Sequence, residues 1–216
     1  MPNVPNYTRE MEAVLKGLGD KRPRLLLHAC CGPCSSAVLE QLSQFFDITI
    51  LYYNPNIWPE AEYHRREEEL ERFVAQAHPL GVKVVEDRYD PKEFYDAARG
   101  LEQEPERGER CTACYRLRMR RAAQYAAEHG FDWFTTTLSI SPHKDAARIN
   151  RIGQELAAEF GVPHLPSDFK KKNGYLRSLQ LSAEYGLYRQ DYCGCIFSAQ
   201  ARQAEEAEKA GQAAEP

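Results

Sequence analysis

Hydrophobic positions along the chain follow two patterns, one typical of helices and one typical of short buried strands. Apolar residues recur at helical spacing over residues 7–18, so an amphipathic helix is expected there, ending at Gly19. The run RLLLH at residues 24–28 is short and largely apolar, which predicts a buried strand. By the same pattern, further strands are expected at residues 47–53, 82–87 and 132–137.

Segments with helical spacing separate these strands. The run SSAVLEQLSQF after Cys34 predicts a helix, with Ser35 and Ser36 as candidate capping residues. Further helices are expected at residues 59–78, 91–98, 111–129 and 149–160. Strands that alternate with helices predict an α/β fold with a parallel sheet and helices on both faces. Ligands of such sheets gather at the carboxyl ends of the strands.

The alternation stops at Ser167, where an irregular C-terminal segment begins. It reads as a basic loop, a short helix and the sequence YCGC. Residues after Ala199 are rich in Ala, Glu and Gln, which predicts a solvated helical or disordered tail. The chain has 216 residues, 43% of them hydrophobic, and can bury one core. We therefore expect a single domain over residues 1–199 and a tail over residues 200–216.

Charge and the absence of targeting signals narrow the class of protein. No stretch approaches the roughly 20 apolar residues of a membrane span, and the N-terminus lacks a secretory signal, so a cytoplasmic protein is expected. The net charge of −4 conceals an asymmetry. Residues 111–189 hold twelve Lys and Arg against seven Asp and Glu, a net +5, which leaves −9 for the rest. Such a basic stretch is either a solvated face or a surface for nucleic acid.

The seven cysteines fall into three close groups, a pattern typical of metal or redox chemistry in a reducing compartment. The first group lies in HACCGPC at residues 28–34, where a strand passes into a helix. Thiols at a helix start have lowered pKa values, which suits them to ligation or nucleophilic attack. Cys31 and Cys34 alone resemble a thioredoxin active site. The extra Cys30, the missing Trp and the four further cysteines argue against that alternative.

The other two groups leave more than one chemistry open. Cys111 and Cys114 are three residues apart and share one side of a helix start, a spacing that suits either zinc or an iron–sulfur cluster. Zinc would make the chain a metal-stabilised RNA-binding module without catalysis. In YCGC, a disulfide between Cys193 and Cys195 would close a small, easily reduced ring. This pair is therefore either redox-active or a pair of metal ligands.

Seven segments of the chain, taken in order, resemble the cobalamin-independent epoxyqueuosine reductases, QueH. They are LLLHACCGPCSS, YYNPN, EYHRR, RCTACYRLRM, FTTTLSISPHKD, DFKKKNGYLRS and YRQDYCGCIFS, and together they contain all seven cysteines. The resemblance implies a Rossmann-like sheet of the PP-loop ATPase type. HACCGPC stands where those ATPases have a phosphate loop, so ATP binding is not expected. The implied reaction is the last step of queuosine biosynthesis, in which the epoxide of epoxyqueuosine in the tRNA anticodon loop is reduced to an alkene.

The resemblance also implies roles for individual cysteines. It makes Cys30, Cys31, Cys111 and Cys114 the ligands of a [4Fe-4S] cluster, and Cys193 and Cys195 a redox-active pair capable of forming a disulfide bond. It further implies an adjacent mononuclear iron or other metal, for which the candidate ligands are Cys34, Cys193 and Cys195. The electron donor is not named by the sequence.

Reduction of the epoxide requires two electrons, two protons and a binding site for the anticodon loop. Because a cluster transfers single electrons, a dithiol or second iron would complete the reduction. Candidates for proton delivery are Asp191, Tyr192, His28 and His143. Anticodon bases stack on aromatic side chains while basic residues contact phosphates. The candidates for tRNA contact are Tyr53, Lys144, Lys170, Lys171, Lys172, Tyr175 and Arg177, of which the last five are expected in one loop.

Overall fold

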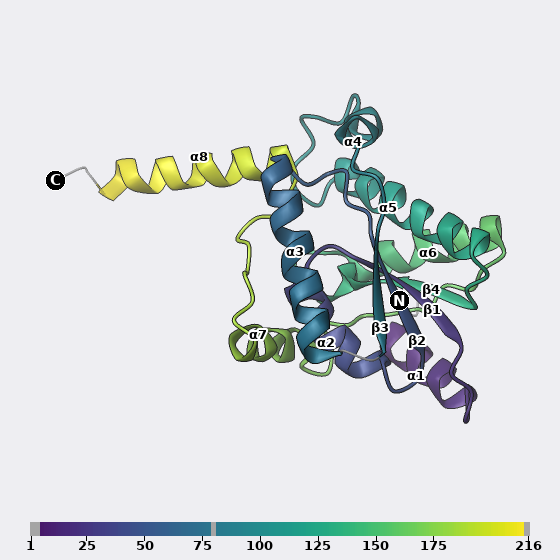
Figure 1. Ribbon diagram of the computed structural model, residues 1–216. Helices are drawn as coiled ribbons and strands as arrows, with labels where there is room; N and C mark the ends of the chain where they lie inside the picture. The colour runs from purple at the N-terminus through teal and green to yellow at the C-terminus, as the bar shows by residue number, and fades with distance from the viewer. Residues whose placement is uncertain (1–4, 79–80, 214–216) are drawn as a thin grey trace.

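A four-stranded parallel sheet forms the centre of the protein, in the strand order β3-β2-β1-β4 (Figure 1). The computed structural model describes residues 5–78 and 81–213. The strands are β1 (Arg24–Ala29), β2 (Asp47–Tyr52), β3 (Val82–Glu86) and β4 (Trp133–Thr136). Each predicted strand is present, with its ends displaced by at most one residue. The apolar runs identify the strands correctly because β1 and β2 are covered on both faces.

Helices cover both faces of the sheet, which confirms the predicted Rossmann-like α/β fold. Side chains of β1 alternate between the faces, so Leu25 and Leu27 join one core and Leu26 joins the other. The first core contains side chains of α1 (Tyr7–Gly17), α2 (Gly32–Leu42), α3 (Glu60–Ala77) and α7 (Gly174–Glu184). The second contains side chains of α5 (Glu109–Glu128) and α6 (Ala146–Phe160). Helix α4 (Pro91–Ala98) packs against α5.

The start of α2 corrects the prediction that Ser35 and Ser36 cap this helix. The helix begins at Gly32 and its N-cap is Cys31, so both serines lie inside the helix. Their hydroxyls donate to carbonyls of the preceding turn, Ser35 to Cys31 at 2.8 Å and Ser36 to Pro33 at 3.0 Å. Proline is well tolerated in the first turn of a helix, which allows the earlier start. As a result the helix begins directly at the cysteine motif.

The basic loop is also shorter than predicted. Helix α7 begins at Gly174, so Tyr175 and Arg177 lie on a helix, and only the three lysines remain in the preceding turn. A Cβ on Gly174 would lie 1.9 Å from the carbonyl oxygen of Phe169, so the chain can turn here only because the residue is glycine. This close approach depends on tertiary packing, which residue spacing does not reveal.

The C-terminal helix, α8 (Ile196–Ala213), extends away from the rest of the molecule (Figure 1). The expected domain boundary after Ala199 therefore falls inside one helix, and residues 214–216 lie outside the described part of the chain. The short 3-10 helix η1 (Thr137–Ile140) continues β4 towards α6. Over the described residues, no helix is both long enough and apolar enough to cross a membrane.

Asn150 fixes the segment that follows α6 to this helix. Its buried side-chain amide donates to the carbonyls of Ala146 and Ser167, each at 2.7 Å, and accepts from the Ser167 N–H at 2.8 Å. We predict that Asn150→Ala lowers the free energy of unfolding by about 2–3 kcal/mol, because it leaves buried polar groups unpaired. Urea denaturation would measure this loss. The exposed Gln154→Ala on the same helix should change it by less than about 0.5 kcal/mol, and similar losses in both variants would contradict the prediction.

Candidate active site

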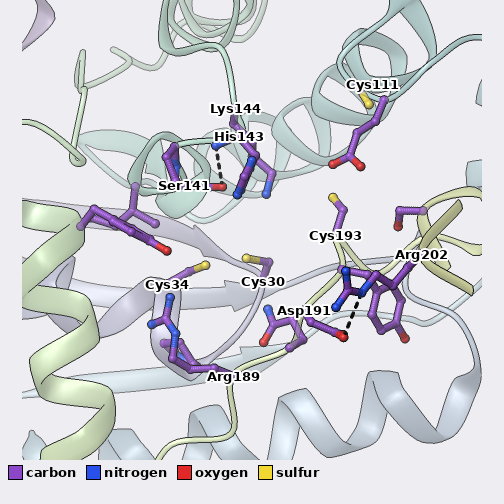
Figure 2. Close-up of a pocket in the computed structure, with 18 of the residues that line it drawn as sticks. Cys30, Cys34, Cys111, Ser141, His143, Lys144, Arg189, Asp191, Cys193 and Arg202 are labelled. Carbon is purple, nitrogen blue, oxygen red and sulfur yellow. Dashed lines mark hydrogen bonds and ion pairs between the residues drawn. The ribbon is translucent and has the colours of Figure 1, made fainter. Parts of the chain in front are cut away.

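A cavity of about 410 Å³ opens at the carboxyl ends of the strands, where a ligand was expected. Cys30 enters it from the end of β1, and residues 141–144 enter it after β4 and η1. Cys111 lines it from the first turn of α5, and Cys193 from the segment before α8 (Figure 2). The cavity therefore brings together residues from all three cysteine motifs.

The first motif forms a compact group of thiols. The sulfur atoms of Cys30, Cys31 and Cys34 lie within 4.8 Å of one another, and those of Cys30 and Cys31 are 3.8 Å apart. Hydrogen bonds from Cys31 and Cys34 hold the pKa of the Cys30 thiol well below its ordinary value, and raise the pKa of Cys34 in turn. The amide of Gln190 donates to the sulfur of Cys31 at 3.2 Å. This triad can bind a metal through sulfur.

The second motif places its two thiols at different depths. Cys111 lines the cavity, and its sulfur accepts a hydrogen bond from the backbone N–H of Arg107 at 3.2 Å. Cys114, one turn further along α5, is buried in an apolar cluster with Cys195 and Phe94. Burial raises the pKa of the Cys114 thiol to about 12. Helix α5 thus carries one thiol that lines the cavity, Cys111, and one that lies in a buried apolar cluster, Cys114.

The third motif is held in place by α3 and by the loop that precedes it. Gly194 has a φ of +118°, and its carbonyl accepts a hydrogen bond from the N–H of Trp58 at 2.8 Å. The buried Arg66 donates from Nη1 to the carbonyl of Cys193 at 3.2 Å, and from Nε to Glu62 at 2.7 Å. All seven cysteines carry free thiols, so the Cys193 and Cys195 pair, which could form a disulfide bond, is reduced in this structure.

Lys144 places a positive charge beside these sulfur atoms. Its side chain is half-buried and lines the cavity (Figure 2). Burial would lower the pKa of the ammonium group, but thiolate charge on Cys193, Cys30 and Cys34 outweighs burial and raises it. The cavity therefore combines cysteine sulfurs with a cation, an arrangement that suits anionic groups.

Comparison with known proteins assigns the chain to a family. The sequence profile described as "Epoxyqueuosine reductase QueH" matches residues 25–201. A relative of that name from Streptococcus pyogenes is 45% identical over 90% of this chain and 78% of its own length. Another, from Thermotoga maritima, is 35% identical over 85% of this chain and 94% of its own length. This chain belongs to the epoxyqueuosine reductase QueH family.

Among solved structures, a predicted tRNA methyltransferase subunit from Methanocaldococcus jannaschii has a TM-score of 0.47 at 16% identity, covering 74% of both chains.

The cysteines to which the QueH resemblance assigns the cluster come from two elements that meet at the cavity. Cys30 and Cys31 lie between the end of β1 and the start of α2, whereas Cys111 and Cys114 lie on α5. The resemblance makes Cys34 a candidate ligand of an adjacent metal. In the structure its sulfur lies within 4.8 Å of the sulfur atoms of Cys30 and Cys31. The ligand roles of the individual cysteines stay predictions.

The residues that were expected to contact the tRNA substrate of the QueH family are dispersed. Lys144 and Tyr175 line the cavity. Tyr53 is buried and donates its hydroxyl to Glu93, and Lys171 is exposed outside the cavity lining. The remaining three pair with carboxylates: Lys170 with Asp168 at 2.6 Å, Lys172 with Glu12, and Arg177 with Glu40 at 2.6 Å.

The four candidates for proton delivery differ in burial and in whether they line the cavity. His28 is fully buried, and its ring nitrogens contact the hydroxyl of Thr136 and the carbonyl of Tyr53. Burial lowers the pKa of His28 to about 4, so the ring is neutral near pH 7. The Tyr192 hydroxyl donates to a backbone carbonyl. Asp191 and His143 line the cavity and are exposed.

Several cavity residues were missed by sequence reasoning. Arg189 and Gln190 belong to YRQDYCGC, so their motif was recognised while their position in the cavity was not. Arg202 lies on α8, in the segment expected to be a tail, and donates to Asp191 at 3.3 Å. No sequence pattern marks Arg202, because its position depends on how α8 leaves the domain.

Gly194 should be essential for the conformation of the YCGC segment. A Cβ added there would lie 2.8 Å from Nη1 of Arg66, in a backbone conformation that side chains rarely adopt. We predict that Gly194→Ala lowers the free energy of unfolding by about 2 kcal/mol or more, measured by urea denaturation. Gly186→Ala is the matched control, since its φ is +58° with nothing within 4 Å, and it should cost about 1 kcal/mol. Equal losses would show that the Arg66 contact is unimportant.

Proposed function

We propose that this chain reduces the epoxide of epoxyqueuosine in the tRNA anticodon loop to the alkene of queuosine, and that it does so with a [4Fe-4S] cluster. The observation that carries the proposal is the convergence of three cysteine motifs on one cavity in a chain of the QueH family. An adjacent mononuclear iron or other metal and an external electron donor belong to the same proposal.

The side chains around the cavity suit a cluster of iron and sulfide. Three cysteine sulfurs lie within 4.8 Å of one another, and cysteine thiolates are the usual ligands of such clusters. Arg66 and Arg118 are buried, and each has an Nη2 without a hydrogen-bond partner among the described residues. Sulfide and thiolate sulfur would accept these N–H groups. Cys30, Cys31, Cys111 and Cys114 would hold the cluster, which when bound supplies single electrons to the substrate.

The chain's own residues bind the nucleoside and handle the protons. Conversion of an epoxide to an alkene consumes two electrons and two protons and releases water. Tyr175 offers a ring on which the modified base can stack, and Lys144 and Arg189 offer positive charge to the flanking phosphates. Of the proton-delivery candidates, Asp191 and His143 stand at the cavity with exposed side chains, and we assign the protonation of the departing oxygen to one of these two.

The two alternative functions fit the site less well. A thioredoxin-like enzyme needs an accessible attacking thiol, but Cys31 is only 1% exposed and lies beside a third thiol of the same motif. A zinc-stabilised RNA-binding module would use the same cysteines, but it leaves the cavity without a reaction. Anaerobic purification with iron, sulfide and zinc analysis separates all three functions.

Cys111 provides the sharpest test of the cluster. We predict that Cys111→Ala loses the iron, the sulfide and the visible absorption of the anaerobic protein, and forms no queuosine from epoxyqueuosine tRNA with a chemical reductant. Mass spectrometry of the digested tRNA would measure the product. Arg116→Gln, an exposed change on the same helix, should retain both properties. Full activity of Cys111→Ala would refute its assignment as a ligand.

Lys144 should contribute more to tRNA binding than the other candidate lysines. We predict that Lys144→Ala weakens binding of an anticodon stem-loop and reduces the slope of log affinity against log salt by about 1, because one phosphate contact is lost. Fluorescence anisotropy at several salt concentrations measures both effects. Lys172→Ala is the control, since Lys172 pairs with Glu12 outside the cavity lining. A larger effect for Lys172 would place the tRNA elsewhere.

A further inference from the structure

Arg118 is a buried cation that no carboxylate neutralises among the residues the structure describes. It lies one turn after Cys114 on α5, and its side chain is among the largest fully buried in the protein. Its Nε donates to the carbonyl of Cys114 at 3.3 Å, while its Nη2 has no partner within the described residues. By contrast, the neighbouring arginines of α5 form ion pairs: Arg116 with Glu155, Arg120 with Glu159, and Arg121 with Asp87.

A charge buried in this way requires a compensating negative charge. An isolated ion away from water is strongly unfavourable unless a partner balances it. Burial would lower the pKa of the guanidinium, but charge on the sulfur atoms of Cys114, Cys193 and Cys30 outweighs burial and raises it. Each of these cysteines belongs to a different one of the three motifs, so charge from all three motifs acts on Arg118.

Two other cations near the cysteines are balanced in other ways, while the buried Arg110 donates to the backbone carbonyls of residues 101, 102 and 104. Arg66 is equally buried, but its Nε contacts the carboxylate of Glu62 at 2.7 Å. Lys144 lines the open cavity and is only half-buried, so water screens its charge. Of Arg66, Lys144 and Arg118, Arg118 is the one whose charge neither a carboxylate nor solvent balances.

We propose that Arg118 is a positioning residue that balances the negative charge of the metal–thiolate group held by the three cysteine motifs. The inference rests on the proposed function for the identity of that group, but it does not depend on the epoxide reaction. Metal ions bound by several thiolates carry net negative charge, and a fixed cation in a low-dielectric site stabilises that charge. Arg118 therefore strengthens metal binding and raises the reduction potential, because the reduced group carries one more negative charge.

Titration of the metal-free protein with Co²⁺ tests the first consequence without substrate or reductant. The thiolate-to-cobalt absorption band reports binding to cysteine. Arg118→Met, which fills most of the same space without charge, should bind Co²⁺ about tenfold more weakly. Arg118→Lys retains the charge and should stay within about threefold of the unaltered protein, and the exposed Arg116→Gln should not differ from it.

Two further measurements separate a charge-balancing role from a structural one. In a redox titration of the reconstituted protein, a tenfold loss in the equilibrium constant of one-electron reduction appears as a shift of about −59 mV in Arg118→Met. The metal-free Arg118→Met protein should melt at or above the temperature of the unaltered protein, because an unbalanced buried charge has been removed.

The outcomes that would overturn the proposal are distinct from failure of the proposed function. Unchanged Co²⁺ affinity in Arg118→Met, or equal losses in the Met and Lys variants, would show that the charge does not act on the metal. A metal-free Arg118→Met protein that fails to fold would also overturn it, since the proposal gives this charge no stabilising role without metal. A protein that shows the predicted Co²⁺ and potential shifts but forms no queuosine would refute the reaction and leave the role of Arg118 intact.

Discussion

The sharp turn from β1 into α2 is the constraint on which the rest of the site depends. The strand ends at Ala29 and the helix begins at Gly32, so the three thiols of the motif must lie together at the start of a helix. A Cβ on Gly32 would lie 3.3 Å from the carbonyl oxygen of Glu69, which shows how closely α2 approaches α3 at this turn. This close packing fixes where α3 lies relative to the first cysteine motif.

Helix α3 also fixes the position of the YCGC segment near the C-terminus. Arg66 extends from α3 to the carbonyl of Cys193, and the loop before α3 bonds to Gly194 through Trp58. The YCGC segment, more than 120 residues away in sequence, is therefore positioned by groups that α3 and its loop hold against the first motif. Burial of Arg66 with Glu62 makes this connection rigid, since breaking either contact would leave a buried charge unpaired.

The sequence predicts the sheet better than it predicts the site. Continuous apolar runs mark β1 and β2 because both of their faces are covered, and helical spacing marks the helices that cover them. The order of elements places the first two cysteine motifs near the carboxyl edge, but it does not place YCGC, which comes after the alternation has stopped. The burial of Arg118 is not predicted either, because arginine is usually exposed and nothing in RLRMRR distinguishes one arginine from its neighbours. The early start of α7 depends on the approach of Phe169 to Gly174, which is a tertiary contact.

The pairing of surface charges changes the meaning of the basic stretch over residues 111–189. Its net charge of +5 left a solvated face and a surface for nucleic acid as alternatives, and most of its arginines and two of its lysines face carboxylates. The pairs that use acids inside the stretch are Arg116 with Glu155, Arg120 with Glu159, Arg148 with Asp145, and Lys170 with Asp168. Those that use acids outside it are Arg121 with Asp87, Lys172 with Glu12, and Arg177 with Glu40. Charge paired in this way attracts phosphate weakly. Within the stretch, the Lys and Arg side chains that line the cavity are those of Lys144 and Arg189. Recognition of an RNA loop at such a site would depend more on the shape of the cavity and on stacking against Tyr175 than on a wide basic surface.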